Sequence, residues 1–189
     1  MLTEITQFLL NVFLQGFASL LLFRFLLQWL RAPLRNPLGE FIMAITDFAA
    51  LRARRYIPSL WLLDTATLLL AFIVEFIYLT LTHVVLTGHS LLNFPSLGLI
   101  ALSLVELLKM SVYLLMSALI AQAILSWVNP RTPFAPTLSA ITQKFLRPIQ
   151  RVLPLMGNVD LSPLVLLVIC QIILFAPIAM LENFALSLF

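Results

Sequence analysis

Long apolar stretches alternate along this chain with short segments that carry most of its charge. Each stretch can cross a bilayer, because the hydrocarbon core is spanned by roughly 20 residues of helix. The stretches lack the alternation of a half-buried strand, and helices satisfy their backbone groups inside lipid. The pattern therefore predicts an all-α membrane protein with four spans, at about residues 5–30, 62–86, 97–127 and 161–188.

Two of the connecting segments have the pattern of amphipathic helices. Residues 38–56 and residues 134–152 place apolar side chains at helical spacing. Charged residues fall on another side: Glu40, Asp47 and Arg54 in the first, and Lys144, Arg147 and Arg151 in the second. Such helices are expected to lie flat in the headgroup boundary, and the alternative is a dip into the membrane lined by protein.

The basic residues gather in the same two segments, whereas the connection at residues 88–96 contains no Lys or Arg. By the positive-inside rule, both basic segments face the cytoplasm, and both termini and the middle loop lie outside. Glu4 is the only charge before the first apolar run. A cleaved signal begins with basic residues, so we interpret this run as a retained span.

Composition excludes most soluble functions. Hydrophobic residues make up 62% and charged residues 10% of the chain, against about 25% charged residues in a typical soluble domain. The net charge of +3 is concentrated beside the spans, which favours membrane orientation over binding of nucleic acid.

Catalytic and metal-binding motifs are absent from the sequence. Cys170 is the single cysteine, which excludes an internal disulfide and a multi-cysteine metal site. His83 and His89 do not share a helix face and have no further ligands nearby in the sequence. Without a phosphate loop, a nucleophile elbow or a zinc-protease motif, we expect no enzyme activity and no cofactor.

The two halves of the chain are related by a constant offset of 96 positions. Matching pairs are Asn36-Pro37 with Thr132-Pro133, Ile45-Thr46 with Ile141-Thr142, Arg55-Tyr56-Ile57-Pro58 with Arg151-Val152-Leu153-Pro154, and Asp64 with Asp160. We divide the chain into repeats at residues 1–90 and 91–189. Each repeat holds two spans, so both have the same membrane orientation and form two parallel hairpins.

The repeated Trp, Asn-Pro, Ile-Thr, Arg-x-x-Pro and Asp pattern resembles the YggT family of bacterial membrane proteins, whose plant and cyanobacterial relatives are called YlmG. The match is closest at residues 146–163, whereas Trp61 and Thr67 depart from it in the first half. The resemblance implies a multi-pass protein of the bacterial inner membrane. It also implies links to osmotic-stress tolerance and ion homeostasis, or to membrane-complex assembly in plastids.

A first group of candidate residues consists of charged residues inside the second and third predicted spans. Glu75 lies near the middle of the second span, where a charge costs roughly 3 kcal/mol. Glu106 and Lys109 share one face of the third span. We predict that Glu75 pairs with Lys109, with Glu106 nearby, as a polar clasp between the hairpins. The alternative is part of an ion or proton path.

The repeated motif supplies a second group of candidate residues. Asp64 and Asp160 open the second and fourth spans, where each is expected to cap its helix, or to form a cation or partner site shared by the repeats. Both acids could also pair with the arginines of the motif. The complete set of candidate interface residues is Arg55, Pro58, Asp64, Arg151, Pro154 and Asp160.

Arg24, within the first span, either snorkels to the interface or pairs with one of these acids. Anionic lipid headgroups are the expected contacts of Arg52, Arg54, Lys144 and Arg147. The sequence thus favours a non-enzymatic accessory or assembly protein of the inner membrane, with a membrane-protein partner or a second copy of itself. The alternative is a small oligomeric ion channel or transporter.

Overall fold

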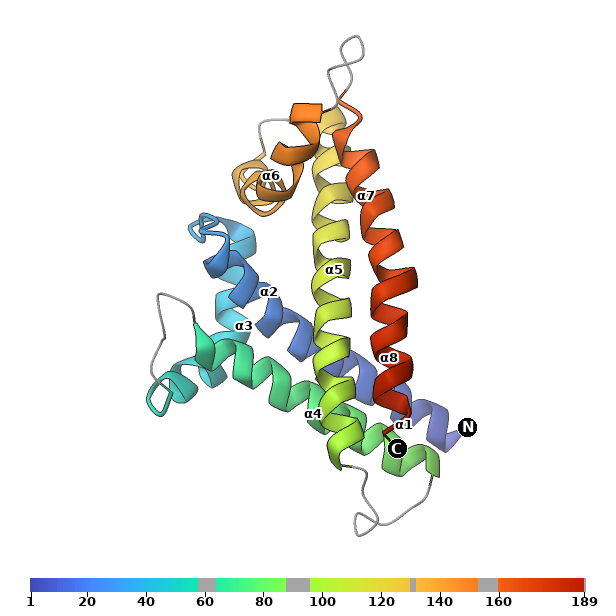
Figure 1. Cartoon of the computed structure of the whole chain (residues 1–189). Helices are drawn as coiled ribbons and strands as arrows, with labels where there is room; N and C mark the ends of the chain where they lie inside the picture. The colour runs from blue at the N-terminus through green and yellow to red at the C-terminus, as the bar shows by residue number, and fades with distance from the viewer. Residues whose placement is uncertain (58–63, 88–95, 130–131, 153–159, 189) are drawn as a thin grey trace.

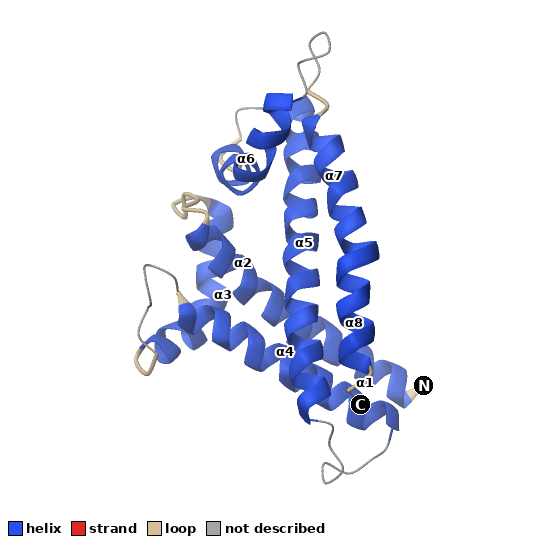
Figure 2. Ribbon diagram, in the orientation of Figure 1, coloured by secondary structure: helices blue, strands red, loops and turns tan. Residues whose placement is uncertain are grey.

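The computed structural model describes residues 1–57, 64–87, 96–129, 132–152 and 160–188. Within these residues every regular element is a helix and no strand occurs (Figure 2). The elements are α1 Leu2–Leu10, η1 Asn11–Gln15, α2 Gly16–Trp29, α3 Pro37–Arg54, α4 Thr65–Thr87, α5 Ser96–Val128, α6 Ala135–Val152, α7 Ser162–Ile173, η3 Leu174–Ile178 and α8 Ala179–Leu186.

Four helical stretches in the described residues are long and apolar enough to span a membrane: Leu2–Trp29, Thr65–Leu86, Leu97–Ser126 and Ser162–Leu186. The predicted all-helical fold with four spans is therefore confirmed. The first and fourth spans each contain one π-helical turn, η1 and η3. Pro177 lies inside η3, and its missing N–H accounts for a local change in helical hydrogen bonding.

The spans pack as two pairs that cross obliquely (Figure 1). Helix α2 packs along α4, and α5 packs along α7, η3 and α8. Between α2, α4 and α5, a core of buried residues includes Leu21, Ala71 and Leu107. A separate core around Leu119 and Cys170 joins α5, α6 and α7. Apolar contact thus holds each pair together, and α5 touches both.

Helices α3 and α6 occur where the amphipathic segments were predicted. The α3 helix begins with Asn36, whose side-chain oxygen accepts a hydrogen bond of 2.9 Å from the Gly39 N–H, followed by Pro37 in the first turn. A Cβ on Gly39 would lie 2.2 Å from the Leu34 carbonyl oxygen. Only glycine therefore permits this close approach of the loop to the helix. The flat placement of both helices in the headgroup boundary stays a prediction.

Large apolar side chains cover the outer surface of the spans. Phe13, Leu164 and Phe175 are 67%, 60% and 88% exposed. Surfaces of this kind are unfavourable in water over such an area, and the bilayer shields them.

Candidate functional site

An ion cluster lies between the third and fourth spans. The Lys109 ammonium on α5 is 3.1 Å from a Glu106 carboxylate oxygen on the same helix and 3.1 Å from a Glu182 oxygen on α8. All three side chains are partly buried. The pairing fastens α8 to α5, so a polar clasp does exist, but within the second pair of spans.

Glu75 does not take part in this cluster, so the predicted Glu75–Lys109 pair is wrong. Packing of α5 against α8 brings Glu182 to Lys109, and two carboxylates already bind the ammonium. The Glu75 side chain is fully buried, and neither carboxylate oxygen has a hydrogen-bond partner among the described residues. Glu106 is close enough to interact with it electrostatically. An unpartnered carboxyl group in this position is costly and therefore needs an explanation.

A polar hollow of about 410 Å³ adjoins the ion cluster. One wall is the π-helical turn η1 and the start of α2, and the other is α5. Its polar lining residues are Asn11, Gln15, Ser19, Glu106, Lys109 and Tyr113. Asn11, Gln15 and Glu182 were not among the residues predicted from the sequence. The available signal was their polarity within otherwise apolar spans.

Asp64 immediately precedes α4, the second span, and joins this helix to α3. The Arg54 Nε donates to an Asp64 oxygen at 3.2 Å, a second guanidinium nitrogen pairs with the other oxygen, and the Thr67 N–H donates at 3.4 Å. Burial by itself would raise the pKa of Asp64. The hydrogen bonds from Arg54 and Thr67 and the positive charge of Arg54 outweigh it and hold the pKa below its ordinary value of 3.8.

In the second repeat, the corresponding acid, Asp160, is bound by a glutamine in place of an arginine. Gln150, 96 positions after Arg54, donates to Asp160 at 2.8 Å, and the Ser162 N–H also donates to Asp160, at 2.9 Å. The acids thus bind the residues that precede Arg55 and Arg151, and the expected pairs with those arginines are wrong by one residue. Both Arg55 and Arg151 are exposed. Pro58 and Pro154 lie outside the described residues.

Each repeat also ties its first span to the following short helix. The Arg24 guanidinium lies 2.7 Å from Thr46 Oγ1 and 2.7 Å from an Asp47 oxygen, and the arginine is buried. In the second repeat, Thr142, which corresponds to Thr46, donates to Gln122. Arg24 therefore neither snorkels nor pairs with Asp64 or Asp160, because α3 supplies its partners.

The repeats contact each other through the loop that precedes α3. The Asn36 amide donates to the Thr137 hydroxyl on α6, and that hydroxyl donates to the Pro33 carbonyl at 3.1 Å. Asn36 and Thr137 are both buried. This polar link joins the two halves at the end of the spans that carries α3 and α6.

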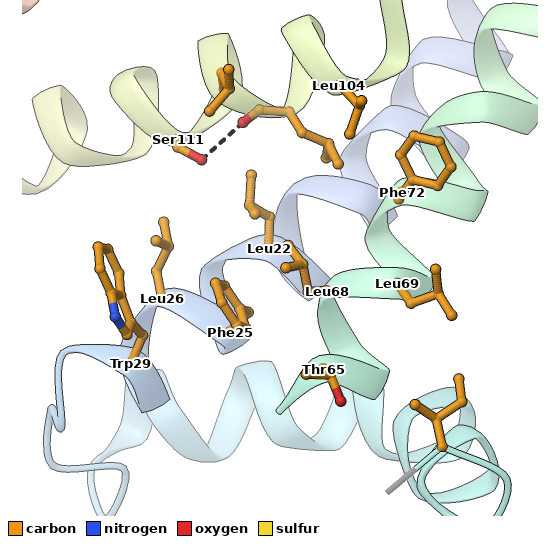
Figure 3. A pocket seen from close by; sticks show the side chains of 13 residues that line it. Leu22, Phe25, Leu26, Trp29, Thr65, Leu68, Leu69, Phe72, Leu104 and Ser111 are labelled. Carbon is orange, nitrogen blue, oxygen red and sulfur yellow. Dashed lines mark hydrogen bonds between the residues drawn. The ribbon is translucent and has the colours of Figure 1, made fainter. Parts of the chain in front are cut away.

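An apolar groove lies between the two pairs of spans, beside the core that joins them. A hollow of about 910 Å³ between α2, α4 and α5 is lined by Leu22, Phe25, Leu68 and similar residues (Figure 3). A second hollow of about 600 Å³ lies between α2, α5, α6 and α7. Both share four lining residues, so we treat them as one inter-pair groove: Leu26, Trp29, Leu108 and Ser111.

The expected headgroup contacts differ in what they touch. Arg54 forms an ion pair with Asp64, so its charge is already compensated within the protein. Arg52 and Arg147 are exposed. Lys144, also exposed, lines the groove and places its ammonium 4.7 Å from the centre of the Trp29 ring. In the described part of the chain, no three His, Cys, Asp or Glu side chains come together as a metal-binding group.

Comparisons with known proteins identify the family. The family model described as CCB3/YggT matches residues 3–85 and 101–181, one match in each repeat. The Escherichia coli K12 protein YggT is 34% identical over 167 residues, covering 88% of this chain and 85% of the relative. A Vibrio alginolyticus protein is 32% identical, covering 86% and 87%. A Haemophilus influenzae protein is 31% identical, covering 80% of each.

No solved structure matches the fold. The assignment therefore rests on the sequence relatives and on the two tandem matches, which agree with the repeated polar contacts described above. This chain belongs to the CCB3/YggT family.

Proposed function

We propose that this protein is a non-enzymatic accessory or assembly protein of the bacterial inner membrane, and that it holds an apolar occupant in the inter-pair groove. The observation that carries the proposal is the chemistry of the groove. Over the residues that the structure describes, its lining is Leu, Phe, Ile and Trp almost throughout, with a single charged residue, Lys144. A water-filled ion path needs polar groups along its length, and this groove lacks them.

The short helices support a docking role. Buried polar contacts fix α3 and α6 to the spans beside them, through Arg24 in one repeat and Gln122 in the other. Helices held in this way present their remaining surface in a constant geometry. With the basic connectors on the cytoplasmic side, a bound protein or lipid would meet a preformed site there.

Photo-cross-linking in native membranes tests this function. A photoreactive residue replaces Leu104, which lines the groove, or Phe175, which is exposed on the fourth span. We expect discrete adducts, to a protein or to a defined lipid, from position 104 alone. The same unselective lipid adducts from both positions would refute a groove with a specific occupant.

A role in osmotic-stress tolerance has its own test. A deletion strain is grown at high osmolarity and complemented with wild-type protein or with Leu104→Trp, which fills the groove. We expect the wild type alone to restore growth, with equal amounts of both proteins in the membrane. Full complementation by Leu104→Trp would separate the groove from that physiological role.

A second candidate function, ion or proton transport, rests on Glu75. Its buried, unpartnered carboxyl group lies near Glu106, which also lines the polar hollow beside Lys109. Reconstituted liposomes with a pH-sensitive or potassium-sensitive dye give the test. Flux that Glu75→Gln abolishes, with the protein still folded, would favour transport. Identical leakage from empty and protein-containing vesicles would exclude it.

A further inference from the structure

We propose that the occupant of the inter-pair groove is an anionic phospholipid, with its phosphate bound at Lys144 and its acyl chains between α2 and α5. This inference rests on the proposed function, because it names the occupant of the same groove. Three observations support it: the shape and lining of the groove, the cation at its mouth, and the absence of an equivalent site in the first repeat.

The lining favours hydrocarbon over a polar ligand. Among the described residues, Lys144 is the only charged residue that lines either hollow. Ser111 contributes a hydroxyl, but this donates to the Leu107 carbonyl of its own helix at 2.8 Å, as the dashed line in Figure 3 marks. In the same view, Leu22 and Leu26 point from α2 toward α5. An acyl chain fills such a space without leaving polar groups unsatisfied.

Lys144 supplies positive charge where the apolar lining ends. Its ammonium lies over the face of Trp29 and forms no ion pair with a carboxylate in the described part of the chain. Arg147 and Arg151 follow on the same helix, both exposed, and α6 contains no acidic residue. A phosphate at this point would meet a cation oriented by an aromatic ring, with further positive charge along α6.

At the corresponding position, the first repeat has an aromatic residue in place of the cation. Phe48 occupies the position that corresponds to Lys144, 96 residues earlier, and stacks on Phe17 with ring centroids 5.4 Å apart. The same helix carries Glu40 and Asp47. A general affinity for the membrane surface would use both short helices alike. The difference predicts one selective lipid site in each chain, beside α6.

Quenching of Trp29 fluorescence tests the site directly. The double variant Trp61→Phe/Trp127→Phe leaves Trp29 as the single tryptophan, since the chain has three. It is reconstituted in phosphatidylcholine vesicles that contain a minor fraction of either phosphatidylglycerol or phosphatidylcholine with brominated chains. We expect phosphatidylglycerol to quench Trp29 more strongly, because the anionic headgroup brings its chains into the groove.

Charge variants in this background identify the cation. Lys144→Gln should reduce the preference for phosphatidylglycerol roughly fivefold, the factor expected for one basic residue at the surface. Lys144→Arg should keep the preference, which also shows that the site still folds. The matched control Arg35→Gln removes an exposed charge from the loop before α3, at a residue without an expected lipid contact, and should have no effect.

Two outcomes would overturn the inference: equal quenching by both brominated lipids, or an unchanged preference in Lys144→Gln. Its failure is distinguishable from failure of the proposed function. Equal quenching together with a discrete protein adduct at position 104 would place a protein in the groove and leave the function standing. Equal quenching without any discrete adduct would refute both the lipid site and the proposed function.

Discussion

Removal of Glu75 and removal of Lys109, two of the ionisable residues inside the spans, should change the free energy of unfolding in opposite directions. Lys109→Met leaves the Glu106 and Glu182 carboxylates, 18% and 32% exposed, facing each other without their cation. Breaking a fully buried pair costs about 3–5 kcal/mol. Because these carboxylates are partly exposed, we expect the free energy of unfolding to fall by about 2 kcal/mol, below that range.

Glu75→Met removes a carboxyl group that has no hydrogen-bond partner among the described residues. An unsatisfied buried polar group costs about 1–3 kcal/mol, so replacing it with an apolar side chain of similar size should stabilise the protein by about 1 kcal/mol or more. Had the predicted Glu75–Lys109 pair formed, both substitutions would destabilise the protein.

The chain contains its own reporter for this measurement. Cys170 is the single cysteine and is 2% exposed in the core between α5 and α7. A maleimide dye that fluoresces on reaction should label it only after the helices separate. Detergent-solubilised protein is titrated with a denaturant, and the labelling midpoint gives the order of stability.

Glu4→Gln, at an exposed position before the first span, is the control and should leave the midpoint unchanged. A midpoint for Glu75→Met as low as that for Lys109→Met would refute the reasoning. Glu75 would then have a stabilising partner.

The first two of three further predictions use the same labelling assay, and the third uses intrinsic tryptophan fluorescence, because maleimide reacts with the thiolate, which is scarce in acid. Gly39→Ala should destabilise the protein by about 1–3 kcal/mol because its Cβ meets backbone, whereas Gly16→Ala, whose Cβ meets only a carbonyl oxygen at 4.0 Å, should have little effect. Arg24→Gln reproduces the residue of the second repeat and should cost less than Arg24→Met, whose excess would be about 1 kcal/mol; equal losses would contradict a retained hydrogen bond. The lowered pKa of Asp64 contributes stability above about pH 4 that is lost as pH falls through the folded-state pKa; Asp64→Asn should therefore destabilise at neutral pH, and its midpoint should depend less on pH below 4 than that of the wild type.

The spans and the repeat could be predicted from sequence because each depends on a pattern within a short window. Apolar runs of sufficient length have one stable form in lipid, and a constant offset through polar residues identifies corresponding positions. The contact of Asp64 with the first turn of α4 was predictable for the same reason, since capping is local.

Contacts between helices were harder to predict from the sequence. Spacing shows that Glu106 and Lys109 share a face, but not that α8 packs against that face and brings in Glu182, 73 residues after Lys109. The choice of Arg54 over Arg55 has a similar origin. One residue corresponds to a rotation of about 100° around a helix, so the partner of Asp64 depends on how α3 is rotated against α4.

The hydrogen bond between Asn36 and Thr137 shows that two similar repeats need not contact each other through equivalent residues. In a contact obeying the offset of 96, Phe41 would have to approach residue 132 in the same manner, yet Phe41 is 57% exposed. The interface therefore joins unlike surfaces. A protein made of two identical halves would have to use one sequence for both sides of this joint. Because the two repeats are fused in one chain, each can carry its own residues at this contact, and the two sides of the interface can differ.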